Sequence, residues 1–197
     1  MEKEYKWRAD EALLGQALLW AASHLGSQSR TIHMRSQYFD TADGLLHRHD
    51  TALRLRRENE QLVCCMKRRN VSTVAGMRAH EEYECEAGSI EEGLSLLPAH
   101  GAPHDICALA LSAPLVITCE VDFRRCAILL QQNNTVCELA LDEGELRRGE
   151  RTAPLCEIEL ELIAGDEAAF HTLASDLANH LSLIPEPQSK LARALAL

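Results

Sequence analysis

The sequence predicts an α+β fold in which a closed, antiparallel, eight-stranded β-barrel carries helices packed on its outside. About eight short segments place a charged side chain at every second position, which is the period of a β-strand. Most connections are short or contain turn residues such as Asn133 and Asn134, so neighbouring strands are expected to pair antiparallel. Three amphipathic helices are available to cover the apolar strand faces. The charged faces are then expected to line the lumen of the barrel.

The strands are expected where the alternation is clearest, and each has one ionic face and one apolar face. The first strand opens the chain and places Glu2, Glu4 and Lys6 on its ionic face. The other strands are expected over Arg35–Asp40, Ala52–Arg57, Gln61–Arg68, Arg78–Glu86, Leu115–Leu130, Thr135–Asp142 and Leu155–Ile163.

The three helices have recognisable start and stop signals. Leucine and alanine recur at helical spacing over Asp10–His24. A second helix begins at Ser89, which forms a capping box with Glu92. A third begins after Asp166 and ends before Pro185.

The length and composition indicate one domain, over residues 1–197. The segment Pro98–Pro114 is the only connection that resembles a hinge, and it is too short to separate two domains. No apolar run reaches the roughly 20 residues of a membrane span, and no signal-peptide region opens the chain, so we expect a cytoplasmic protein with no membrane partner. The net charge of -10 argues against non-specific binding of nucleic acid. The sequence does not indicate an oligomeric state.

The eight cysteines lack a C-x-x-C spacing, which argues against a zinc site or a thioredoxin-type motif. Cys85, Cys137 and Cys156 alternate with glutamates and are expected on the apolar strand faces. We therefore expect reduced, structural thiols.

The sign of the charge is sorted by segment. Antiparallel sheets often keep one face in water, and a solvated face would show the same alternation. A solvated face usually mixes the two signs, however, whereas here the last strand has only acids on its ionic face and two middle strands have only bases. These residues are Glu157, Glu159 and Glu161 on the acidic strand and Arg54, Arg56, Lys67 and Arg69 on the basic ones. A lumen lined by basic side chains on one part and by acidic side chains on another suits a polyphosphate bound together with Mg²⁺ or Mn²⁺.

The charged segments resemble the CYTH domain, the family of triphosphate tunnel metalloenzymes, over nearly the whole chain. The opening E-K-E-Y-K is similar to the E-x-E-x-K signature, and L-R-L-R is similar to L-R-x-R. The segments Q-Y-F-D-T and Met66-Lys67, the late segments C-E-L-A-L-D-E-G-E and P-L-C-E-I-E-L-E-L, and Ser189-Lys190 follow in the same order. Among members, the chain is most similar to the bacterial inorganic triphosphatases, and this implies hydrolysis of tripolyphosphate to pyrophosphate and phosphate.

The resemblance also implies roles for single residues. It implies that Glu2, Glu4, Glu157 and Glu159 hold the metal. The phosphates would be bound by Arg54, Arg56, Lys67, Arg69, Arg124 and Lys190. Lys6 and Tyr38 would act on the reacting phosphate. Further candidates, for a second metal or for fixing the arginines, are Glu82, Glu84, Glu138, Asp142 and Glu161.

Other functions remain open at this point. Thiamine triphosphatases and class IV adenylyl cyclases share the tunnel, but they need a group that holds an organic base, and aromatic residues make up only 4% of this chain. A module that binds polyphosphate or a nucleotide without hydrolysing it would use the same side chains. Many bacterial relatives continue into a helical CHAD domain, so we expect either a stand-alone form or a truncated one.

Overall fold

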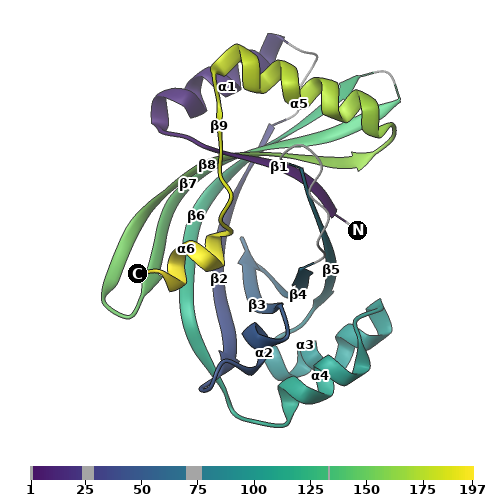
Figure 1. The fold of residues 1–197 in the computed structure, drawn as a ribbon, viewed down its shortest axis with the longest axis vertical. Helices are drawn as coiled ribbons and strands as arrows, with labels where there is room; N and C mark the ends of the chain where they lie inside the picture. The colour runs from purple at the N-terminus through teal and green to yellow at the C-terminus, as the bar shows by residue number, and fades with distance from the viewer. Residues whose placement is uncertain (1, 24–28, 70–76, 133) are drawn as a thin grey trace.

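In a computed structural model, which describes residues 2–23, 29–69, 77–132 and 134–197, nine strands form one antiparallel sheet. The strand order is β5-β4-β3-β2-β6-β7-β8-β1-β9, and β5 also pairs with β1. That last pairing closes the first eight strands into a barrel, and the short β9 pairs with Trp7 and Arg8 at the end of β1 (Figure 1). The predicted fold class is thereby confirmed.

The strands lie at all of the expected positions, and several are longer than predicted. Their bounds are Glu2–Arg8 (β1), Ser29–Thr41 (β2), Thr51–Glu58 (β3), Gln61–Arg69 (β4), Arg78–Glu86 (β5), Leu115–Gln132 (β6), Thr135–Arg148 (β7), Arg151–Ala164 (β8) and Ile184–Pro185 (β9). The helices are Glu11–Ser23 (α1), Leu45–Arg48 (α2), Ile90–Leu96 (α3), a 3₁₀ turn over Leu97–His100, His104–Leu111 (α4), Glu167–Leu181 (α5) and Lys190–Leu195 (α6).

The three predicted helices are α1, α3 and α5, and their capping signals work as expected. The hydroxyl of Ser89 accepts a hydrogen bond from the backbone N–H of Glu92, and Asp166 caps α5 in the same way. The last residue of the predicted first helix, His24, lies outside the described residues.

The segment Pro98–Pro114 is not a hinge, and this expectation was wrong. It contains the 3₁₀ turn and α4, whose residues Ile106, Cys107 and Ala110 are buried in a core. α4 has only eight residues, so its apolar residues recur too few times for the helical period to be recognised in the sequence.

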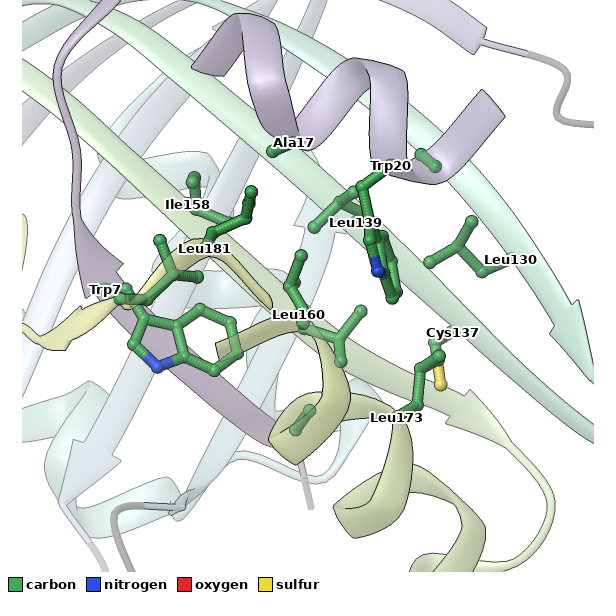
Figure 2. Close-up of a cluster of buried hydrophobic side chains, with 14 of the residues drawn as sticks. Trp7, Ala17, Trp20, Leu130, Cys137, Leu139, Ile158, Leu160, Leu173 and Leu181 are labelled. Atoms are coloured by element: carbon green, nitrogen blue, oxygen red, sulfur yellow. The ribbon is translucent and has the colours of Figure 1, made fainter. Parts of the chain in front are cut away.

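Helices cover the barrel on two sides, and each side has its own core. α1 and α5 pack over β1, β6, β7 and β8, where Trp7, Trp20, Leu139, Ile158 and Leu160 form the first core (Figure 2). α3 and α4 cover β3, β4 and β5 in a second core. Both cores use the apolar strand faces, which leaves the opposite faces for the lumen.

A third core lies on the lumen side of the sheet, which was expected to carry charge throughout. The short helix α6 contributes Leu191, Ala194 and Leu195 to this core. The strand residues that contribute to it come from β2, β6, β7 and β8 and include Ile32, Met34, Tyr38, Val121, Phe123, Leu146 and Leu155. The lumen therefore has an apolar sector next to α6 as well as an ionic one.

All eight cysteines are free in the structure, and six of them are buried. Within the part of the chain that the structure describes, no helix is both long enough and apolar enough to span a membrane.

Candidate active site

Strand β1 supplies the side chains of Glu2, Glu4 and Lys6, at alternate positions, to the lumen. Glu4 and Lys6 are buried and lie opposite Glu161 and Glu159 of β8. The intervening Trp7 points the other way, into the first core. Strand parity thus places the E-x-E-x-K segment as the sequence predicts.

The first ionic group, here called the β3–β5 cluster, joins cations of β3 and β4 to carboxylates of β1, β3 and β5. It consists of Arg54, Arg56, Lys67, Glu2, Glu58, Glu82 and Glu84. Arg54 Nη2 lies 3.0 Å from Glu82 Oε1, and Arg56 Nη2 lies 3.0 Å from Glu84 Oε1. Lys67 Nζ contacts Glu2 and lies 3.3 Å from Glu82 Oε2. Each predicted phosphate-binding cation here is held by a carboxylate of the same wall.

Burial and neighbouring charges shift the pKa values in this cluster. Burial, together with a proton shared with Glu82, raises the pKa of Glu2 to about 9. Burial opposes the charge of Lys67, but Glu4, Glu2 and Glu82 outweigh it and raise the pKa of the ammonium. The cluster therefore has a surplus of carboxylate over cation, part of which is neutralised by a proton.

The second ionic group, here called the β6–β8 cluster, joins three carboxylates to three cations. Its members are Asp142, Glu157, Glu159, Arg125, Lys190 and Arg193. Lys190 Nζ lies 2.9 Å from Asp142 Oδ2 and 2.9 Å from Glu159 Oε1, and it also contacts Glu157. Arg193 Nη1 lies 2.6 Å from Glu157 Oε2. α6 is thus tied to the lumen wall through two of its side chains.

The two glutamates of β8 respond differently to the same surroundings. Burial raises the pKa of Glu157. Burial also opposes the charge of Glu159, but Lys190 and Arg125 outweigh it and lower the pKa of Glu159 well below its usual range. Burial lowers the pKa of Lys6, which lies beside Glu157, Glu159 and Glu4. These groups act as one coupled set rather than as independent ion pairs.

Phe123 separates this cluster from the apolar sector of the lumen. Its ring centroid lies 5.2 Å from Lys190 Nζ and 5.7 Å from Arg125 Cζ, within the range of cation–π contacts. Gly144 of β7 lies opposite Phe123, and a Cβ at Gly144 would lie only 2.5 Å from the Cα of Phe123. The ring of Phe123 therefore contacts both Lys190 and Arg125 from a position where β6 and β7 are closely packed.

Arg124 does not lie in the lumen, and its expected placement was wrong. Its side chain is 71% exposed on the outer face, where it lies 3.5 Å from Glu143. The neighbouring Arg125 is only 15% exposed and points into the lumen. The segment V-D-F-R-R has an arginine of each parity, and Phe123 lies on the lumen side with Arg125. The alternation of this segment does not distinguish the two arginines, so the sequence contained no signal that could have identified Arg125.

Other expected residues lie in varied positions. Tyr38 is buried in the apolar sector, opposite Arg54 of β3. Glu138 faces the lumen and forms an ion pair with Arg30 at 3.0 Å. Arg69 pairs through its backbone with His80, and its side chain lies outside the described part of the structure.

The four carboxylates expected to hold metal do not form one group. Glu2 belongs to the β3–β5 cluster, whereas Glu157 and Glu159 belong to the β6–β8 cluster with Asp142. Among the described residues, two sets bring three ligand atoms within 4.8 Å of one another. They are Asp142, Glu157 and Glu159, and Cys65, Glu82 and Glu84. The first set offers only carboxylate oxygen, the donor that Mg²⁺ and Mn²⁺ prefer.

Sequence reasoning missed four lumen residues. Arg125 and Arg193 contact the candidate metal ligands, Arg30 binds Glu138, and Cys65 Sγ lies 2.8 Å from Glu82 Oε1. Arg193 follows Lys190 at a spacing of three, which a predicted α6 would have placed on the same helix face.

The family model of the CYTH domain matches residues 1–195. An inorganic triphosphatase of Haemophilus influenzae is 27% identical over 144 residues, which cover 71% of this chain and 38% of the relative. The chain thus spans well under two thirds of that relative.

Solved structures share the fold over the full chain. A Hippeastrum protein named as an adenylyl cyclase, which shows a dominant triphosphatase activity, is 23% identical with a TM-score of 0.65, covering 100% of this chain and 96% of its own. A Pyrococcus horikoshii protein is 16% identical with a TM-score of 0.61, covering 100% of this chain and 99% of its own.

Proposed function

Because this chain belongs to the CYTH domain family, we propose that it is a metal-dependent triphosphatase that hydrolyses inorganic tripolyphosphate to pyrophosphate and phosphate. The observation that carries this proposal is the presence of two ionic clusters inside one closed barrel. Arg54, Arg56 and Lys67 of the β3–β5 cluster supply cations that can bind phosphate, and the β6–β8 cluster supplies three carboxylates within 4.8 Å of one another. A triphosphate and a divalent metal need both.

We assign the metal to Asp142, Glu157 and Glu159, with Glu4 and Glu2 of β1 as further ligands on the path between the clusters. Carboxylate oxygens fit Mg²⁺ or Mn²⁺ by the chemistry of the donor set. When bound, such a metal supplies Lewis-acid polarisation of phosphate oxygen and lowers the pKa of nearby water. This changes the rank expected from the sequence, because Asp142 joins the principal ligands and Glu2 becomes secondary.

The phosphate-binding role falls to arginines and lysines on both walls. Arg54, Arg56 and Lys67 bind phosphate oxygens from one wall, and Arg125, in place of Arg124, binds them from the other. They exchange their present carboxylate partners for phosphate as the substrate enters. Arg69 remains a phosphate-binding candidate at the end of β4.

The chemical step is an attack of water on the terminal phosphorus while the bond to the pyrophosphate oxygen breaks. Lys6 lies in the lumen where its ammonium would meet the charge that develops on the reacting phosphate. Glu161 lies opposite Glu4 in the register of β1 and β8, and burial, reinforced by Glu4, raises its pKa to about 7; we propose it as the carboxylate that accepts the proton of the attacking water. Tyr38 packs beside Arg54 and is proposed to orient its guanidinium.

The aromatic residues support inorganic triphosphate over an organic triphosphate. Those that face the lumen, Tyr38 and Phe123, are buried in the core that α6 shares. Neither offers an exposed ring for stacking on thiamine or adenine. We also propose that residues 1–197 act as a single domain in the cytoplasm, where a reducing environment would keep the eight cysteines as thiols.

A phosphate-release assay with Mg²⁺ or Mn²⁺ tests the proposal on tripolyphosphate, ATP and thiamine triphosphate in parallel. The highest kcat/KM is expected for tripolyphosphate, with pyrophosphate and phosphate as products. A higher kcat/KM for thiamine triphosphate, or conversion of ATP to its cyclic product, would replace the proposed substrate. Tight binding of tripolyphosphate without phosphate release would identify a non-catalytic binding module.

A further inference from the structure

The ammonium of Lys190 lies between the three carboxylates that we assign to the metal. It is 2.9 Å from Asp142 Oδ2 and 2.9 Å from Glu159 Oε1, and it contacts Glu157 as well. Asp142 and Glu157 have fully buried side chains, and Lys190 is 10% exposed. A cation from the protein itself therefore already neutralises this group.

Lys190 is the first residue of α6, a helix of six residues that packs into the third core through Leu191, Ala194 and Leu195. Polar contacts add to this packing at both ends of the helix. In its first turn, Arg193 binds Glu157, and the hydroxyl of Ser189 accepts a hydrogen bond from the N–H of Ala192. At the far end, Arg148 and Arg151 of the β7–β8 hairpin donate to the backbone oxygens of Leu195 and Leu197. The ionic contacts of Lys190 and Arg193 therefore help to hold the first turn against the lumen wall.

One position cannot hold both cations. The ligand atoms of Asp142, Glu157 and Glu159 lie within 4.8 Å of one another, which leaves room for a single small cation between them. Mg²⁺ requires oxygen ligands at about 2.0–2.1 Å, a distance that an ammonium in hydrogen bonds to the same oxygens would block. Like charges at such separations also repel strongly in a buried site.

We propose that Lys190 and the metal compete for Asp142, Glu157 and Glu159, so that metal binding expels the ammonium and loosens α6. This rests on the proposed function for the identity of the metal site. Replacing one positive charge by two makes this wall of the lumen more positive, and the freed ammonium adds to that field. Metal and triphosphate consequently bind with positive coupling, because each stabilises the arrangement that the other requires.

Metal binding without substrate tests the competition. Titration calorimetry with Mg²⁺ is carried out on the wild type, on Lys190→Met and on Arg56→Met. Arg56→Met is the control, because it removes the same charge from the lumen but from an arginine that pairs with Glu58 and Glu84, neither of which is assigned to the metal. We expect Lys190→Met to bind Mg²⁺ at least ~10-fold more tightly than the wild type, and Arg56→Met to change by less than ~3-fold.

A measurement on the unmodified protein keeps the test independent of how well Lys190→Met folds. Hydrogen exchange of residues 187–197 is followed with and without Mg²⁺ in the wild type. Because metal would remove the Lys190 contacts, exchange in this segment is expected to become at least ~5-fold faster on adding Mg²⁺.

The competition is overturned if Lys190→Met and Arg56→Met gain affinity by the same factor, which would reflect net charge alone. It is also overturned if Lys190→Met binds Mg²⁺ no more tightly than the wild type, or if residues 187–197 exchange more slowly with Mg²⁺. No triphosphate is present, so these results do not depend on turnover. A wild type that hydrolyses tripolyphosphate while Lys190→Met shows unchanged Mg²⁺ affinity would keep the proposed function and lose this inference.

Discussion

Arg125 holds Asp142 through two parallel contacts, with Nε 2.8 Å from Oδ1 and Nη2 2.7 Å from Oδ2. A two-point contact of this kind aligns the plane of the carboxylate with that of the guanidinium, so it orients the carboxylate as well as neutralising it. Arg125 also contacts Glu159, so one guanidinium links two of the three carboxylates in the β6–β8 cluster.

Arg124 and Arg125 are adjacent but lie on opposite faces of β6, so their variants are expected to differ in activity. Arg125→Gln is expected to lower kcat/KM for tripolyphosphate by at least ~10²-fold, because it removes a phosphate-binding cation and frees Asp142. Arg124→Gln is expected to stay within about 2-fold of the wild type, since its exposed ion pair contributes little. Steady-state kinetics of the two variants test this, and comparable losses in both would contradict the assignment of β6.

Glu157→Gln is expected to lower turnover by at least ~10²-fold without unfolding the protein, because a lost metal ligand removes Lewis-acid stabilisation. Folding should survive, since Lys190 keeps Asp142 and Glu159 as partners. Circular dichroism and kcat at saturating Mg²⁺ are the measurements. Wild-type turnover at saturating metal would remove Glu157 from the metal site.

Lys6 and Arg56 are expected to separate chemistry from binding. Arg56→Ala should raise KM and lower kcat, because a guanidinium on phosphate acts in both the ground state and the transition state. Lys6→Ala should mainly lower kcat, since its ammonium is proposed to meet charge that develops only during reaction. Both parameters are measured for tripolyphosphate at fixed free Mg²⁺. A loss confined to KM in both variants would make Lys6 another binding residue.

Two glycines are expected to respond oppositely to alanine. A Cβ at Gly144 would lie 2.1 Å from the backbone oxygen of Asp122, so Gly144→Ala should lower the free energy of unfolding by at least ~2 kcal/mol. Gly15 of α1 has no neighbouring atom within 4 Å of a Cβ, so Gly15→Ala should raise it by about 0.5–1 kcal/mol. Urea unfolding measures both. A stable Gly144→Ala variant would mean that β6 and β7 shift apart at low cost.

Buried thiols predict a loss of stability in alkali. Burial raises the pKa of Cys137 to about 11 from its ordinary value of 9.0, so the unfolded chain loses this proton at lower pH than the folded one. The stabilisation is complete below pH 9 and is lost as pH rises toward 11, by at most about 1.4 kcal/mol per pH unit. Cys137→Ala should therefore show a shallower decline in unfolding free energy over this window. Parallel curves would contradict the shift.

Most of the barrel could be predicted from the sequence because strand period and charge give the same answer for nearly every strand. The alternation is unbroken over Cys156–Leu162 of β8, and it also holds around Glu4 of β1 and Arg54 of β3, so the sites of Glu4, Arg54 and Glu159 follow from it. Strand β6 lacked that agreement, since Phe123 faces the lumen and Arg124 faces water. An apolar residue inside the lumen has a reason only once α6 is known to pack against it.

The division of the carboxylates was beyond the sequence for a different reason. Parity places Glu2 and Glu157 on the same lumen surface but says nothing about which of them lie close together around the barrel. That depends on the register of β1 against β8 and β5, where Lys6 lies opposite Glu159 and Glu2 lies opposite His80. Short helices such as α6 contain too few residues to show a period, so the position of Arg193 was also hidden.

Strand β1 has a consequence for how the protein folds. It closes the barrel between β5 and β8, and on its outer face Tyr5 bonds to His171, 166 positions further along the chain. Contacts between such distant segments form slowly, because a long loop must close before any of them is made. The lumen takes Glu4 and Lys6 from one end of the chain and Glu157, Glu159 and Lys190 from the other. Catalytic competence should therefore be the last property to return on refolding, after the β2–β4 hairpins have already regained their structure.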